Sequence, residues 1–158
     1  MNKYLVGILA LLLQVEAAAA SCLPGNVMAK WNLVGSLFKD QGVASFAFYC
    51  PELRLISSGG TAQFLAAANC KAMSAGRGAT GAFTISTKGT NVITVNPKTC
   101  VISGRFILTH EGKDFAVKIL TGQMDVPAGN GKPTQGQFVA LAASDLGVVT
   151  ATIIRYAD

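Results

Sequence analysis

The sequence predicts an all-β domain: an antiparallel meander of about eight to ten strands forming a small barrel or sandwich, with two disulfides. Apolar and polar residues alternate from about residue 28 onward, which is the pattern of half-buried strands. Turn residues interrupt the alternation every 8–12 residues, as in meanders, sandwiches and barrels. Four cysteines follow residue 20, and an even number of cysteines in an exported chain usually forms disulfides.

Residues 1–20 are expected to be a cleavable secretory signal. Lys3 supplies a positive charge, residues 4–13 are apolar, and a run of alanines precedes the expected cut after Ala20. The apolar run is too short to span a bilayer, which needs ~20 helical residues. Acylation of Cys22 in a lipoprotein is the alternative, but it would leave one cysteine without a partner. We therefore expect residues 21–158 to form one β domain, periplasmic or secreted, with no transmembrane segment.

In the first half of this domain, alternating apolar residues predict strands at residues 31–37, 44–50 and 53–55. Pro51 is expected to end the second of these, because proline cannot donate to a strand ladder. The next turn is expected at residues 57–60, Ser-Ser-Gly-Gly. Residues 61–73 fit either a strand through Phe64 followed by irregular chain, which is slightly favoured, or an alanine-rich helix.

The second half begins with a small, glycine-rich loop at residues 74–81. Gly112 and Lys113 are expected to form a tight hairpin turn, and residues 126–134 a long loop that contains two prolines and two glycines. Alternation predicts six strands around these turns, at residues 82–87, 91–96, 101–111, 115–119, 137–143 and 147–156.

The four cysteines, Cys22, Cys50, Cys70 and Cys100, can pair in three ways. A hairpin turning at residues 57–60 would bring Cys50 next to Cys70, which leaves Cys22 to pair with Cys100. Zinc binding is not indicated, because no two cysteines have the short spacing of zinc motifs and His110 is the only histidine. No metal or other cofactor is predicted.

The net charge of +5 comes from basic residues that are scattered along the chain without a run or stripe. Nucleic-acid binding is therefore not expected. An anionic surface or another envelope protein stays open as a partner.

No motif predicts catalysis. Residues 76–81 match G-x-G-x-x-G, but β-type residues follow where a dinucleotide site needs a helix. His110 is followed by Glu111, and neighbours on a strand point to opposite faces, so we expect no catalytic dyad. A pair of carboxylates brought together by folding, as in glycosidases, is a less favoured alternative.

Two short segments resemble known families. The segment Lys30-Trp31-Asn32-Leu33-Val34-Gly35-Ser36 resembles the opening strand of lipocalin and avidin-type barrels, which implies that Trp31 closes one end of a barrel. The other tryptophans that avidins use on their ligand are missing, so biotin binding is not implied. Residues 148–158, with Tyr156, resemble the final strand of bacterial pilus subunits, which pairs with a neighbour by strand addition.

The sequence thus predicts an exported, non-enzymatic β domain with a binding or surface-structural role. We expect the contacts on loops, since rigid β scaffolds commonly present function there. The candidates are Arg77 in the loop at residues 74–81, and Asn130 and Lys132 in the loop at residues 126–134. The alternatives are a pilus or adhesin-like subunit, an envelope enzyme inhibitor and, less favoured, a lipocalin-like carrier of small molecules.

Overall fold

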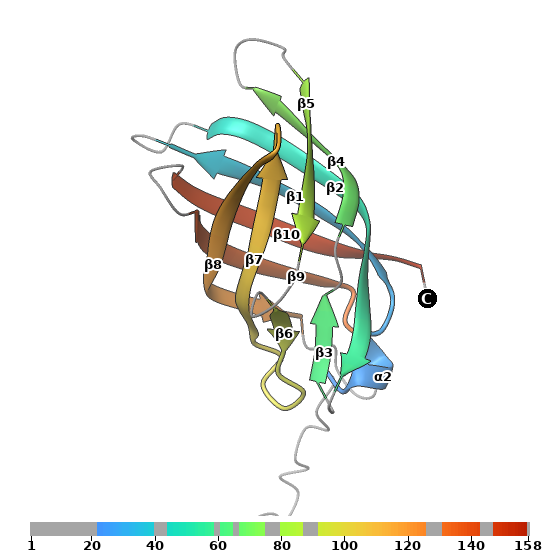
Figure 1. Ribbon diagram of the computed structural model, residues 1–158. Helices are drawn as coiled ribbons and strands as arrows, with labels where there is room; N and C mark the ends of the chain where they lie inside the picture. Colours follow the sequence, from blue (N-terminus) through green and yellow to red (C-terminus); the bar gives the residue numbers. More distant parts are fainter. Residues whose placement is uncertain are drawn as a thin grey trace, which may run out of the picture.

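In a computed structural model, the chain is almost entirely β-structure (Figure 1). The structure describes residues 22–39, 44–58, 61–64, 67–74, 80–86, 92–125, 131–142 and 147–157. One short helix, α2 (Pro24–Val27), precedes the strands. The strands are β1 (Lys30–Phe38), β2 (Ala44–Ser58), β3 (Thr61–Phe64), β4 (Ala67–Ser74), β5 (Thr80–Ser86), β6 (Ile93–Val95), β7 (Ile102–His110), β8 (Lys113–Met124), β9 (Gln135–Ala142) and β10 (Gly147–Ala157).

Eight of these strands close into an antiparallel barrel, in the order β1-β10-β9-β8-β7-β5-β4-β2, and β2 pairs again with β1. The two short strands extend the wall at the end nearest α2. There β3 pairs with the last residues of β2, β6 pairs with the first residues of β7, and β3 and β6 pair with each other. The predicted meander is confirmed, and of the two predicted architectures the chain forms the barrel.

The second strand does not end at Pro51, as the sequence had suggested. Instead β2 continues to Ser58, because Pro51 lies in a β-bulge, one of the positions where a strand tolerates proline. On β1, Asn32 alone stands opposite Pro51 and Glu52, since Trp31 pairs with Leu53 and Leu33 pairs with Cys50. Glu52 has a φ of 57°, and its backbone N–H donates to Oδ1 of Asn32 at 3.4 Å.

Residues 61–74 form strands on both sides of a short interruption, so the helical alternative for this stretch is excluded. Phe64 pairs with Leu55, and Lys71 pairs with Tyr49. The strands β3 and β4 therefore both pair with β2 and run antiparallel to it. The irregular chain expected after Ala67 is replaced by β4. Alanine favours helices only weakly, and pairing with both β2 and β5 outweighs that preference here.

Both disulfides have the favoured pairing, Cys50–Cys70 and Cys22–Cys100. The first links the two arms of the hairpin formed by β2 and β4, and its Cα atoms are 4.1 Å apart. The second fastens the segment before α2 to the chain that enters β7. All four cysteine side chains are buried.

Buried side chains that alternate with outward-facing ones fill the part of the barrel nearer α2, and at the other end the inward side chains of Leu37, Phe48 and Leu108 are half-buried. Two inward phenylalanines lie against glycines on the neighbouring strand: Phe48 against Gly35, and Phe138 against Gly122. Each of these rings also meets another phenylalanine edge to face, because Phe48 lies 5.9 Å from Phe83 and Phe138 lies 6.4 Å from Phe106. The absence of a Cβ on Gly35 leaves room for the Phe48 ring, and its absence on Gly122 leaves room for the Cβ atoms of Phe138 and Ile102.

Candidate functional site

The two loops that the sequence singled out belong to opposite ends of the barrel. Ser74, which begins the first loop, pairs with Phe46 near the far end of β1. Gln135, which follows the second loop, pairs with Ile154 near the α2 end. Arg77 and Asn130 lie outside the described residues. The described residues that flank these two loops therefore lie at opposite ends of the barrel.

Lys132 is exposed, and Asp125 holds the chain that follows it in place. The carboxylate of Asp125 accepts hydrogen bonds from the backbone N–H groups of Thr134 and Gln135, at 2.9 and 3.0 Å, and from the Thr134 hydroxyl at 2.7 Å. Asp125 thus fixes the exit of the second loop, which is a structural task of the kind that Asp commonly has near turns.

Trp31 lies fully buried at the α2 end of the barrel. Its indole Nε1 donates to the carbonyl of Val27, the last residue of α2, at 3.1 Å. The guanidinium of Arg155, on β10, lies over the same ring at 5.7 Å and donates to the carbonyls of Asn26 and Pro133 at 2.8 and 3.1 Å. The Trp31 ring, α2 and Arg155 together cover this end of the barrel.

His110 is at the other end, where it packs against β5. Its Nδ1 lies 2.9 Å from the carbonyl of Ala82, and its ring lies where a Cβ on Gly81 would be. The prediction that Glu111 points away from His110 is wrong. Glu111 and Gly112 both have positive φ and form the hairpin turn, one residue earlier than expected, so Glu111 folds back until its Oε1 lies 3.8 Å from the Nε2 of His110.

One void inside the barrel, lined entirely by described residues, is too small for a ligand. Among the described residues, the interior void has a volume of about 10 Å³, roughly one water-sized probe, and phenylalanines and aliphatic side chains line it. The described residues also include no group of three or more His, Cys, Asp or Glu side chains that could hold a metal ion.

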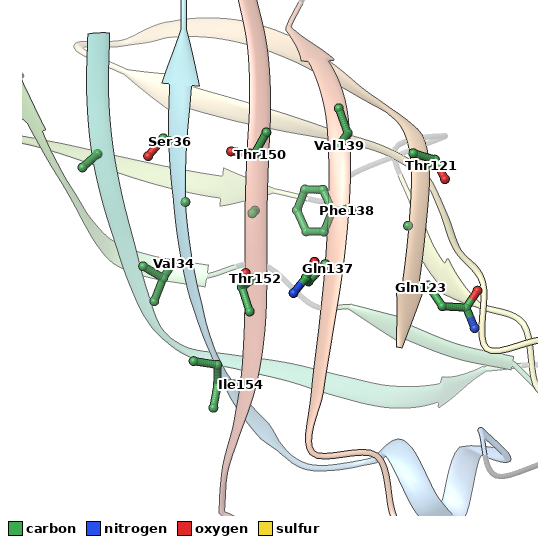
Figure 2. A pocket seen from close by; sticks show the side chains of 14 residues that line it. Val34, Ser36, Thr121, Gln123, Gln137, Phe138, Val139, Thr150, Thr152 and Ile154 are labelled. Carbon is green, nitrogen blue, oxygen red and sulfur yellow. The ribbon is translucent and has the colours of Figure 1, made fainter. Parts of the chain in front are cut away.

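A much larger hollow lies on the outside of the barrel and has a volume of about 820 Å³ (Figure 2). Its lining comes from β1, β2, β8, β9 and β10, five strands that are adjacent in the ring. The strand register sorts the outward side chains into two rows across these strands. The first row is Tyr49, Val34, Thr152, Gln137 and Gln123, and the second is Ala47, Ser36, Thr150, Val139 and Thr121. We call these two rows the outer wall.

No side chain of the outer wall is charged, although the chain carries a net charge of +5. On the α2 side the next row is Glu52, Asn32, Ile154 and Gln135, and on the other side it is Phe38, Val148, Leu141 and Lys118, so charged side chains stand only at the ends of these two rows. Several apolar side chains of these rows are exposed to solvent: Val34 by 43%, Tyr49 by 43%, Ile154 by 46% and Leu141 by 48%. Contiguous exposed apolar surface of this kind commonly marks a contact site for another molecule.

The sequence alone does not reveal the outer wall, because its members come from segments that lie between residues 34 and 152. Each strand by itself shows only the alternation of a half-buried strand. The uncharged rows emerge when the register across five strands is known.

The chain matches no family model, no curated protein and no solved structure. Within the described part of the chain, no helix is long and apolar enough to cross a bilayer.

Proposed function

We propose that this chain is an exported, non-enzymatic binding protein that contacts a macromolecular partner with the outer wall. The observation that carries the proposal is the contrast between the two sides of the barrel wall. The interior void is about 10 Å³, whereas the hollow on the outside is about 820 Å³ and is lined by uncharged side chains from five strands. Of these two spaces, only the one on the outside has room for a ligand.

Export is supported by the cysteines. Two disulfides involve all four cysteines, and such bonds persist in oxidising compartments. The sulfur of Cys22 is bonded to Cys100, which favours free release after Ala20 over acylation of Cys22. We therefore propose a periplasmic or secreted protein that begins at Ser21.

The other functional classes have less support. A lipocalin-like carrier would need an apolar cavity, and the filled interior counts against one. A pilus-type subunit would need a free strand edge, but β10 is hydrogen-bonded to β1 on one side and to β9 on the other. An enzyme inhibitor would act through a protruding loop, and nothing in the described residues favours that role over the outer wall.

Photocrosslinking at two matched threonines tests the proposal. Thr150 lies on β10 at the centre of the second row, and Thr84 lies on β5, four strands away in either direction around the barrel. Both side chains are exposed. A benzophenone amino acid at either position would be activated in the cells that export the chain, and the adducts identified by mass spectrometry.

The proposal predicts discrete crosslinked adducts from position 150 and none from position 84. Adducts that form only from position 84, or no adduct from position 150, would contradict it. A non-enzymatic role further predicts no hydrolytic turnover, so hydrolysis that is lost in the His110→Ala variant would also overturn the proposal.

A further inference from the structure

The outer wall restricts the chemistry of its partner. A charged partner is normally met by side chains of opposite charge, and the outer wall offers none. Threonine, serine and glutamine can donate and accept hydrogen bonds, while Val34, Val139 and Tyr49 supply apolar area. The matching surface should therefore also be uncharged, half apolar and half hydroxyl or amide.

We propose that the partner is a second copy of this chain, and that two barrels associate through their outer walls. This inference rests on the proposed function, because it names the molecule that the outer wall contacts. The outer wall itself has the composition that its partner requires. Two copies with a net charge of +5 each repel one another, and the two rows of this wall keep charged side chains away from the centre of the contact.

The shape of the wall also suits a second copy. Twisted barrels have the form of a hyperboloid, whose wall is convex around the barrel axis and concave along it, and a hollow on the outside of the wall is consistent with this form. Two saddle-shaped surfaces of this kind fit together when one is rotated by about a right angle relative to the other. The convex curvature of each surface then follows the concave curvature of the other.

The area is near what a dimer needs. Five strands at ~4.8 Å spacing and four rows at ~6.8 Å spacing give a face of about 650 Å². Stable interfaces bury roughly 600–1,000 Å² on each partner. The outer wall with its two neighbouring rows, which place Glu52 and Lys118 at the rim of this face, is therefore large enough for a specific, moderately stable dimer.

A twofold interface places the same residues on both copies, so side chains near its centre meet their own copies. Thr150 is the central residue of the second row, with Ser36 and Val139 beside it. A charge at position 150 would therefore face the same charge across the interface. A positive charge at position 150 of one copy and a negative charge at position 150 of the other would attract each other instead.

Sedimentation-velocity ultracentrifugation of the mature, oxidised protein over a wide concentration range tests this inference. The chain is expected to reach a dimer, and Thr150→Arg and Thr150→Glu should each raise the dimer dissociation constant at least tenfold. An equimolar mixture of these two variants should restore a heterodimer. Thr84→Arg, on the opposite side of the barrel, should dimerise like the original chain, and circular dichroism should show all variants folded.

A chain that stays monomeric at every concentration overturns the inference, and so does a dimer that Thr84→Arg weakens and Thr150→Arg does not. These outcomes are separable from failure of the proposed function. If position 150 crosslinks to a different protein while the chain alone stays monomeric, the outer wall is a binding surface and the second copy is excluded. If position 150 crosslinks to nothing, both proposals fail.

Discussion

The guanidinium of Arg155 lies 5.7 Å from the centre of the Trp31 ring, across the end of the barrel that α2 covers. Arg155 comes from the last strand and Trp31 from the first, so this contact joins the two strands whose pairing closes the barrel. The same guanidinium donates to the carbonyls of Asn26 and Pro133, and the indole donates to Val27. Closure of the barrel and covering of its end therefore depend on one small group of side chains.

Replacing Arg155 should destabilise the fold strongly. Arg155→Ala removes two charge-assisted hydrogen bonds and the contact with Trp31, and we expect a loss of about 3 kcal/mol in the free energy of unfolding. Arg155→Lys keeps the charge but has no planar guanidinium to lie over the Trp31 ring, so its loss should be intermediate. Urea denaturation measures the free energy of unfolding of both variants. Arg105→Ala, at an exposed position, is the control and should change stability by less than about 0.5 kcal/mol.

The two disulfides should contribute unequally. Cys22–Cys100 spans 78 residues and Cys50–Cys70 spans 20. Loop-closure entropy then predicts losses of about 4.5 and about 3.3 kcal/mol when each pair is replaced by alanines. Denaturation of the two double variants checks the order. A larger loss for the shorter loop would show that native packing around these cysteines outweighs the constraint on the unfolded chain.

Gly35 and Gly122 should not tolerate a side chain. A Cβ on Gly35 would lie 2.4 Å from the Phe48 ring and 2.4 Å from the carbonyl oxygen of Thr150, and a Cβ on Gly122 would lie 2.7 Å from that of Phe138. We expect each alanine variant to lose about 2–3 kcal/mol of unfolding free energy because of overpacking. Gly25→Ala is the matched control, since nothing lies within 4 Å of its Cβ position, and its thermal midpoint should stay near that of the original chain.

The filled interior should become a binding cavity when Phe138 is shortened. Phe138→Ala removes a buried ring that contacts Phe106 and lines the small void, so we expect a loss of about 3–5 kcal/mol. The empty space would be lined by aliphatic and aromatic side chains, and such cavities take up benzene or xenon. A rise in thermal midpoint with added benzene in this variant, and no rise in the original chain, is the expected result.

Much of this fold could be predicted from the sequence, because the relevant signals are local. Alternation around Trp31, Phe106 and Ile153 reports one buried face for each strand, and the glycines near residue 60 imply the hairpin that joins Cys50 to Cys70. The error at Pro51 arose because a bulge depends on the partner strand. Pro51 avoids the regular ladder only because Asn32 stands opposite two residues of β2.

The outer wall could not be predicted in the same way. Thr150 and Val139 each fit the solvent face of an ordinary strand, and their grouping with Ser36 depends on which strands pair and in which register. The pairing of β1 with β10 joins residues more than 100 positions apart, such as Ser36 and Thr150. The site therefore exists only at the level of the closed barrel.

The central claim is that this protein acts through the outside of a filled barrel. Native mass spectrometry of the chain purified from the compartment that receives it tests this claim most directly, with the Phe138→Ala variant and benzene as the positive control for a retained ligand. We predict the bare mass of residues 21–158 with two disulfides, or a multiple of that mass, and no small molecule released on unfolding. A small apolar molecule that stays bound to the folded chain and leaves when it unfolds would place the function inside the barrel and contradict this account.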